Sequence, residues 1–306
     1  MGTDVHVIVV GKPASTLLTA RRFVAELESR WSRFVASSAI SVLNTMAGTR
    51  VRVSPATLTL VERAIDGARL TSGRFDPTVL GAVVRAGYDR SFELVPPDAQ
   101  RGTSWLQGGW ERIVVDRAAS TIELPEGVGF DPGGIGKGLA ADLLAAELLA
   151  HGAAGVCVNI GGDLIVAGEA SGGGSWAIGV EHPFRREPAA LIGLQQGAVA
   201  TSMRTKRTLG PASEGRHHLI DPVTDEPART GVASVSAIAA AGWHAEVLAK
   251  AAFVSGVEPG LALLESMGAD GLIVDDLGAI RTTRGFDRFT RPAEPCGAAS
   301  PGSDVR

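Results

Sequence analysis

A glycine-rich turn that runs into an apolar helical pattern is the first candidate site in the sequence. Residues 131–142 read DPGGIGKGLAAD, and the apolar pattern continues to residue 151. Glycine lets the backbone approach a ligand, and a helix N-terminus offers free N–H groups with partial positive charge, so such a turn can bind a phosphate. Lys137 would add a cation, and Asp131 could hold the turn or accept hydrogen bonds from a ligand. The alternative is a structural corner with a solvated lysine.

The turn matches neither of the two common phosphate-binding fingerprints. A P-loop needs a glycine five residues before its Gly-Lys pair and a Ser or Thr after it, but Asp131 and Gly138 occupy these positions. The dinucleotide fingerprint G-x-G-x-x-G, counted from Gly134, ends on Leu139 instead of a glycine. The turn by itself therefore does not identify its ligand.

Five further polar stretches, punctuated by glycine, proline or small residues, lie next to apolar runs, where binding sites are usually built. They are SAISVLN at 38–44, GRFDPTV at 73–79, NIGGD at 159–163, ATSMRTKR at 200–207 and HHLIDPVTDEPA at 217–228. The two adjacent histidines are candidate acid–base groups, because imidazole titrates close to working pH. On a strand His217 and His218 would face opposite ways, so only one could point into a site.

Taken together and in this order, these stretches resemble the ApbE family of FAD:protein FMN transferases. The family patterns are similar to an opening M-G-T, S-E-x-S-x-L-N, G-x-F-D-x-T-V, D-x-G-G-I-x-K-G-x-A-x-D, N-x-G-G-D, A-T-S and H-x-I-D-P-x-T-G-x-P. The chain has MGT, SAISVLN, GRFDPTV, DPGGIGKGLAAD, NIGGD, ATS and HLIDPVTDEP. The resemblance runs from Met1 to about Thr282, and the shared order of the motifs makes it specific.

The resemblance implies a fold that binds FAD, cleaves its pyrophosphate with Mg²⁺ and transfers FMN to a Ser or Thr hydroxyl of an acceptor flavoprotein, releasing AMP. The residues that would bind FAD are Met1, Phe34, Arg74, Phe75, Asp76, Asp131, Lys137 and Ile220. The Gly134 carbonyl and Glu246 would bind the metal, and His218 would be the catalytic base. The glycine turn would then hold the FAD pyrophosphate.

A late helix departs from the family pattern at the metal site. The family has an Asp and a Thr four residues apart, as in A-D-A-L-A-T-A, whereas this chain has AEVLAKAAF with Glu246 and Lys250. Side chains at this spacing share one face of a helix. Either the two form an ordinary ion pair, or the Lys250 ammonium takes part of the metal's volume and neutralises phosphate charge itself. Mg²⁺ binding would then be weakened or replaced.

This departure keeps two further hypotheses open beside the transferase. One is a non-catalytic FAD-binding protein on the same scaffold, which would yield no AMP. The other is an FAD pyrophosphatase, in which water replaces the protein hydroxyl and free FMN is released. Smaller departures are Ala39, Met203 and Asp225, which stand where the family has Glu, Gly and Gly.

The elements that must position these residues mix without a steady alternation of strands and helices, which favours an α+β fold with a mixed sheet and flanking helices. The chain has no clear linker, so we expect one ApbE-like domain at 1–290, which could have two lobes, and a flexible tail at 291–306. Helices are expected at 15–31, 55–71, 139–151, 245–254 and 259–267. Strands are expected at 4–10, 112–116, 121–124, 156–160, 176–180, 191–194, 218–220, 232–239, 272–275 and 279–282.

Composition excludes several classes of protein. The chain has 306 residues, of which 45% are hydrophobic and 20% charged, with a formal net charge of −4 and no basic stripe, so nucleic acid is not the expected partner. The two cysteines, Cys157 and Cys296, are too far apart in the sequence for a CxxC metal motif. No apolar run approaches the length that spans a membrane, and no secretory signal precedes the first strand, so we expect a cytoplasmic protein.

Overall fold

The structure is a computed structural model, and it describes residues 3–11, 15–88, 105–106, 108–206, 208–209 and 216–290. The predicted tail at 291–306 and the predicted FAD contact Met1 lie outside the described residues. Within the described part of the chain, no helix combines the length and the apolar character that crossing a bilayer requires.

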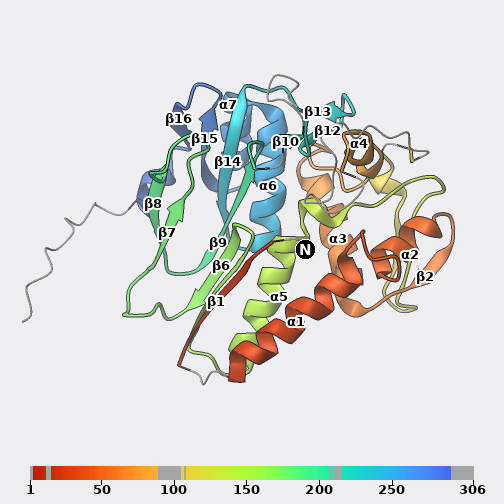
Figure 1. The fold of residues 1–306 in the computed structure, drawn as a ribbon, viewed down its shortest axis with the longest axis horizontal. Helices are drawn as coiled ribbons and strands as arrows, with labels where there is room; N and C mark the ends of the chain where they lie inside the picture. Colours follow the sequence, from red (N-terminus) through yellow and green to blue (C-terminus); the bar gives the residue numbers. More distant parts are fainter. Residues whose placement is uncertain are drawn as a thin grey trace, which may run out of the picture.

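The largest sheet among the described residues has seven strands (Figure 1). Its order is β1-β5-β6-β9-β14-β15-β16, and every neighbouring pair is antiparallel. The strands are β1 (Val5–Val10), β5 (Gly155–Ile160), β6 (Asp163–Gly168), β9 (Gly197–Met203), β14 (Val232–Ala239), β15 (Asp270–Asp275) and β16 (Ile280–Thr282). The two edges are therefore formed by the first and the last strand of the described chain.

Both faces of this sheet are covered. Helices pack on one face: α1 (Ser15–Trp31), α5 (Gly136–Ala150), α6 (Gly242–Ser255) and α7 (Val257–Ser266). On the other face, a second apolar cluster joins the sheet to the hairpin of β7 (Trp176–Val180) and β8 (Ala190–Leu194) and to the short 3-10 helix η5 (Phe286–Phe289). Because both faces are covered, β14 is buried along nearly its whole length.

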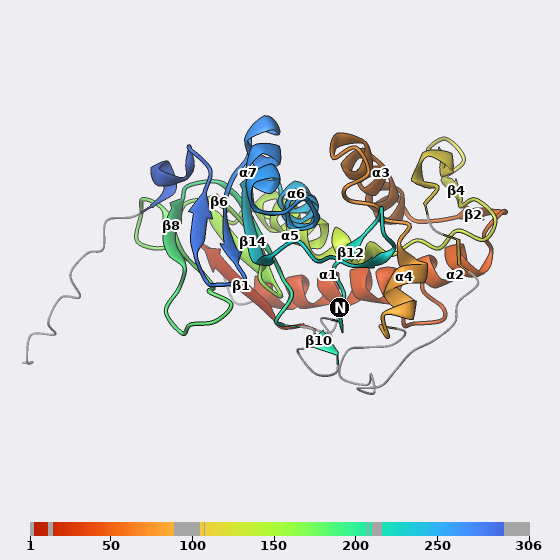
Figure 2. The ribbon, with the colours of Figure 1, turned by 90° about the horizontal axis from the view of Figure 1, so that it is seen from above.

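A second group of elements lies beyond α5 and α6, away from the sheet (Figure 2). It contains α2 (Ala39–Thr45), α3 (Pro55–Leu70), α4 (Leu80–Arg85) and a small sheet of β2 (Arg50–Arg52), β4 (Thr121–Glu123) and β3 (Val114–Asp116). One hydrophobic cluster joins this group to the large sheet, with Leu43 and Leu60 in the same core as Leu144 and Val156. The predicted α+β fold of a sheet with flanking helices is confirmed.

Several predicted boundaries were wrong. The expected strand at 218–220 does not form, because β11 (Arg216–His217) ends before it and β12 (Ile220–Asp221) begins at its last residue. The His217 ring accepts a hydrogen bond from the Leu219 N–H, so a local side-chain bond replaces the strand ladder there. The expected strand at 112–116 begins only at Val114, since Trp110–Arg112 form the 3-10 helix η2.

The remaining short strands form two-stranded pairs. β10 (Thr208–Leu209) pairs with β11, and β12 pairs with β13 (Glu226–Pro227). Asp225, which stands where the family has glycine, has a φ of 61° in the turn between β12 and β13. Aspartate tolerates this left-handed conformation better than most residues, so the departure at Asp225 leaves the turn intact.

Candidate functional site

Predicted site residues from separate parts of the sequence line one cavity of about 220 Å³. The end of α1, the connection from α3 to α4, the turn before α5, the loop between β11 and β12, and α6 enclose it. The predicted residues in its lining are Phe34, Arg74, Phe75, Asp76, Asp131, Gly134, Lys137, His218 and Ile220. Lys250 also lines the cavity, whereas Glu246 does not. The structure thus brings together all the predicted FAD-binding residues that it describes.

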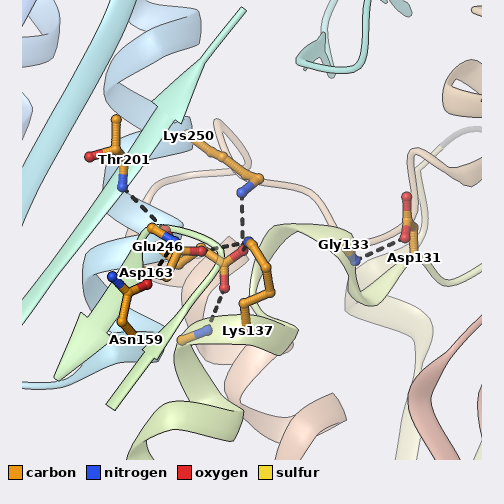
Figure 3. Close-up of polar contacts among 10 residues, drawn as sticks. Asp131, Gly133, Lys137, Asn159, Asp163, Thr201, Glu246 and Lys250 are labelled. Carbon is orange, nitrogen blue, oxygen red and sulfur yellow. Dashed lines mark hydrogen bonds and ion pairs between the residues drawn. The ribbon is translucent and has the colours of Figure 1, made fainter. Parts of the chain in front are cut away.

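Asp131 holds the glycine turn in shape. It precedes the 3-10 helix η3 (Pro132–Gly134), and its carboxylate accepts a hydrogen bond of 2.9 Å from the Gly133 N–H (Figure 3). The Arg33 guanidinium lies 3.5 Å from the same carboxylate oxygen, and both side chains are mostly buried. Asp131 therefore shapes this wall of the cavity and fixes a cation beside it.

Asn44 fixes the chain that enters this turn. Its side-chain amide donates to the Phe130 carbonyl at 2.9 Å and accepts from the Phe130 N–H at 2.7 Å. Asn44 ends the SAISVLN stretch, and α2 presents it after Ser38 caps the helix by accepting from the Ser41 N–H. The stretch at 38–44 thus helps to position the glycine turn, because Asn44 holds the backbone of Phe130 just before Asp131.

Asp76 shapes the neighbouring part of the lining, in the GRFDPTV stretch, because the Asp131 N–H donates a hydrogen bond of 2.8 Å to the Pro77 carbonyl. Its carboxylate accepts hydrogen bonds from the backbone N–H of Thr78, at 2.6 Å, and from the Thr78 hydroxyl, at 2.5 Å. Burial raises the pKa of this carboxyl, although both hydrogen bonds act to lower it. Just before it, the Phe75 N–H donates to the Thr71 hydroxyl, which holds the Phe75 ring against the cavity.

The start of α5 packs directly on the start of α6. A Cβ on Gly138 would lie 2.3 Å from the Gly242 carbonyl oxygen, so only glycine allows this approach. Asp142, one turn later, accepts hydrogen bonds from the first two N–H groups of α6, those of Gly242 and Trp243, at 2.6 and 2.9 Å. Burial raises the pKa of the Asp142 carboxyl to about 6 despite these bonds.

Lys137 is the centre of a buried ion-pair network (Figure 3). Its ammonium lies 2.5 Å from a carboxylate oxygen of Glu246 and 2.5 Å from one of Asp163. Burial acts to lower the pKa of Lys137, but the two carboxylates outweigh it and raise this pKa above its usual range. The alternative of a solvated lysine is therefore wrong.

Glu246 is 1% exposed and fully engaged. Besides Lys137, it accepts a hydrogen bond of 2.9 Å from the Gly138 N–H and lies 3.3 Å from the Lys250 ammonium. Burial acts to raise its pKa, but the two ammonium groups lower it to about 2. The N–H groups at the start of the helix after the glycine turn were expected to be free. One of them, that of Gly138, is instead hydrogen-bonded to Glu246.

Asp163 completes the network from β6. It ends the NIGGD stretch, and its other oxygen accepts a hydrogen bond of 3.2 Å from the Thr201 N–H on β9. Asn159, in the same stretch, accepts a hydrogen bond of 2.8 Å from the Gly162 N–H and so closes the turn between β5 and β6. The NIGGD and ATS stretches therefore meet behind Lys137 and do not line the cavity.

Only one of the two adjacent histidines lines the cavity. His217 is buried, its Nε2 lies 3.1 Å from the Ala228 carbonyl oxygen, and its Nδ1 accepts from the Leu219 N–H, so both ring nitrogens serve the fold. Burial lowers the pKa of His217. His218 lies at the cavity, and its ring centroid is 5.9 Å from that of Tyr88 in an edge-to-face contact.

The residues that would hold Mg²⁺ do not fit a divalent cation as they are arranged. Among the described residues, no group of three or more His, Cys, Asp or Glu side chains could hold a metal ion. The Glu246 carboxylate instead faces two ammonium groups, which would repel a cation. The Lys250 methylenes come close to the turn, since a Cβ on Gly134 would lie 3.2 Å from the Lys250 Cδ.

Sequence reasoning did not assign roles to several residues that build the site. Asn44, Asp142 and Asp163 each stood in a noted stretch, but none was given a role there. Each is a polar residue that ends its stretch next to an apolar run, which was a usable signal. Arg33 and Tyr88, which line the cavity, carried no such signal.

Comparisons with known proteins agree on one family. A sequence model of the ApbE family matches residues 1–273. The chain is 34% identical over 270 residues to the FAD:protein FMN transferase of Treponema pallidum, covering 81% of this chain and 74% of that protein. It is 28% identical over 300 residues to the enzyme of the same name from Vibrio cholerae, covering 94% and 88%.

Solved structures of the same family are similar in fold. The crystal structure of the ApbE protein from Thermotoga maritima superposes with a TM-score of 0.85 at 29% identity, covering 95% of this chain and 97% of that one. The flavin transferase ApbE from Vibrio cholerae gives a TM-score of 0.77 at 26% identity, covering 94% and 96%. The likeness therefore extends over nearly the whole of each chain.

Proposed function

The chain belongs to the ApbE family, and from this premise we propose that it is an FAD:protein FMN transferase. It would move FMN from FAD onto a Ser or Thr hydroxyl of an acceptor flavoprotein and release AMP. The observation that carries the proposal is the convergence of the GRFDPTV, DPGGIGKGLAAD and HLIDP stretches on one cavity. These stretches are far apart in the sequence, so their convergence supports a shared ligand.

The cavity offers groups that suit the parts of FAD. Phe34, Phe75 and Ile220 supply apolar and aromatic surface for a flavin or adenine ring. Lys137 and Lys250 supply positive charge beside the glycine turn, where the diphosphate would lie. We therefore assign the glycine turn to the diphosphate and the aromatic walls to the rings.

His218 is the proposed catalytic base. In the reaction, the acceptor hydroxyl oxygen would bond to the phosphorus on the FMN side, and the bond from that phosphorus to the bridging oxygen would break. His218 would take the hydroxyl proton, and AMP would leave with the bridging oxygen. The products, AMP and an acceptor joined to FMN by a phosphoester, account for every atom of the reactants. The cavity would contribute mainly by aligning the two reacting groups.

Mg²⁺, which the resemblance implied, enters no step of this proposal. Gly134 and Glu246 were the expected ligands, but the carboxylate is engaged by two ammonium groups. This arrangement also keeps the non-catalytic FAD-binding protein as a second candidate, because one ammonium neutralises less phosphate charge than a divalent cation does.

One assay separates the candidates. The purified protein is incubated with FAD and a flavoprotein subunit that carries a Ser/Thr acceptor motif, and AMP, free FMN and in-gel flavin fluorescence of the acceptor are measured. AMP with a fluorescent acceptor band supports the transferase. AMP with free FMN and no band identifies the pyrophosphatase, and bound FAD without AMP identifies the non-catalytic protein.

The matched control is the same acceptor with its motif Ser or Thr replaced by Ala. This control must abolish the band without preventing FAD binding to the transferase. A band that persists on the altered acceptor would contradict transfer to that hydroxyl.

A further inference from the structure

Figure 3 shows the ion-pair network of Lys137, Asp163, Glu246 and Lys250. The positive groups of this network lie toward the cavity. Both lysines line the cavity, and neither carboxylate does. The side chains of Asp163 and Glu246 are 3% and 1% exposed, against 21% and 19% for Lys137 and Lys250. The carboxylates thus lie behind the ammonium groups, so an anion in the cavity would meet the ammonium groups first.

The two ammonium groups differ in how firmly their carboxylates hold them. That of Lys137 lies between two carboxylate oxygens, each at 2.5 Å. That of Lys250 has one contact among the described residues, to Glu246, and this contact is longer, at 3.3 Å. An ammonium has three N–H donors, so Lys250 keeps donors for an anion in the cavity.

Lys250 also fills the space between the two residues that the family resemblance assigned to Mg²⁺. Its ammonium contacts Glu246, and its chain lies along Gly134, where an added Cβ would be 3.2 Å from Cδ and 3.3 Å from Cε. A Cβ there would also lie 2.6 Å from the Phe75 ring. Glycine at 134 therefore leaves room for the lysine stem beside the turn.

We infer that in this chain the Lys250 ammonium takes the place of the divalent cation, and that FAD binds to Lys250 and Lys137 without Mg²⁺. This inference rests on the proposed function, because it concerns the diphosphate of the same substrate. Glu246 then serves as the anchor that orients Lys250, and it is not a metal ligand. Burial lowers the pKa of Lys250, and the Lys137 ammonium lowers it further, whereas the Glu246 carboxylate raises it. A diphosphate in the cavity also favours the charged form of Lys250. The cation that meets FAD is then carried by the chain itself, so FAD affinity is insensitive to chelation.

The test measures the FAD dissociation constant of the wild-type protein by titration calorimetry, in EDTA and in millimolar MgCl₂. We expect the two values to agree within about threefold, well below the tenfold or larger change that losing one charge-assisted contact causes. Lys250→Thr should bind FAD about tenfold or more weakly in EDTA and recover in MgCl₂, since the smaller side chain leaves room for the ion.

A matched variant controls for loss of charge alone. Lys206 is an exposed lysine paired with Glu181 that does not line the cavity. Lys206→Thr removes the same charge and should leave the FAD dissociation constant unchanged in both buffers. A loss of affinity in Lys206→Thr equal to that in Lys250→Thr would overturn the assignment, because net charge would then explain both.

Binding of Mn²⁺, followed by its EPR signal in the presence of FAD, gives a second readout that does not depend on turnover. Wild type should leave the Mn²⁺ signal free, and Lys250→Thr should quench it. Wild-type FAD affinity that rises about tenfold or more with MgCl₂, or wild-type quenching of Mn²⁺, would overturn the inference and leave the proposed function standing. Absence of FAD binding in both buffers would overturn the proposed function itself.

Discussion

Gly138 on α5 and Gly242 at the start of α6 place the two helix backbones in direct contact. A Cβ on Gly138 would lie 2.3 Å from the Gly242 carbonyl oxygen, and a Cβ on Gly242 would lie 2.6 Å from that of Gly138. This close crossing lets Glu246, one turn along α6, reach both the Gly138 N–H and the Lys137 ammonium. The glycines thus set the distance across which the network forms.

Gly138→Ala should destabilise the fold by about 1–3 kcal/mol, because the added methyl group must push two backbones apart. Gly136→Ala is the matched control on the same helix. Its Cβ would lie 3.6 Å from the Pro132 Cβ, an ordinary contact, and alanine favours the helix. Urea denaturation of both variants tests this, and equal free energies of unfolding would contradict the close crossing.

Asp142 should make stability fall as the pH rises through mildly acidic values. Its pKa is about 6 in the folded chain against 3.8 for an unperturbed aspartate, so between these values the folded state binds more protons than the unfolded state. The free energy of unfolding therefore decreases across this window, by about 3 kcal/mol in all. Asp142→Asn should lack this slope, and urea denaturation across the window would show it; a slope equal to wild type would contradict the assignment.

Glu246 should have the opposite effect on the pH dependence of stability, and make the free energy of unfolding rise with pH in acid. Its pKa falls from 4.5 to about 2 on folding, so its contribution to stability is complete above 4.5 and is lost as the pH falls toward 2. Glu246→Gln leaves two ammonium groups without their shared carboxylate, and we expect a cost of about 3 kcal/mol or more at neutral pH.

The free energies of unfolding of Glu246→Gln and of the wild type should become more alike as the pH falls, and chemical denaturation at several pH values measures this. Glu62→Gln is the control, since Glu62 pairs with the exposed Arg117 and its loss should cost about 1 kcal/mol or less. A Glu246→Gln cost no larger than that of Glu62→Gln would show that the buried network does not stabilise the fold.

The sequence predicted which residues would meet at the cavity, and it did so through motif order. Arg74, Asp131 and His218 come from three distant stretches, and periodicity alone says nothing of their meeting. The long helices were predicted at 15–31, from apolar spacing, and at 55–71, and they form at 15–31 and 55–70. Apolar spacing is informative for such helices because a surface helix must repeat its buried positions every three or four residues.

The strands β6 and β9 were not predicted. β6 reads DLIVAG, whose Leu-Ile-Val run was a usable strand signal. β9 reads GAVATSM, whose small residues are buried at the centre of the sheet but lack strong β-propensity. The ion-pair network was also out of reach, since Lys137 and Glu246 are 109 residues apart and only the crossing of α5 and α6 joins them. The four-residue spacing in the sequence indicated that Glu246 and Lys250 could pair, but it gave no sign that Lys137 would join them.

Asn44 should be essential to the fold of the turn. Asn44→Ala would leave the Phe130 N–H and carbonyl without their side-chain partner in a buried place, and we expect a loss of about 3 kcal/mol. Thr45→Ala removes only an exposed hydroxyl bond to the Ser41 carbonyl and should change stability by about 0.5 kcal/mol or less. Thermal denaturation compares the two, and similar melting temperatures would contradict the role of Asn44.

Substitution of the two adjacent histidines should affect different properties, the activity at His218 and the stability of the fold at His217. His218→Ala should lower FMN transfer by about 10²–10⁴-fold, because the hydroxyl proton loses its acceptor, while the melting temperature changes little. His217→Ala should instead destabilise the fold by about 1–3 kcal/mol, because the Leu219 N–H and the Ala228 carbonyl lose their buried ring partner. Rates of acceptor labelling and melting temperatures are measured for both variants. If His217→Ala abolished transfer at full stability, or if His218→Ala kept it, the assignment of the base to His218 would be wrong.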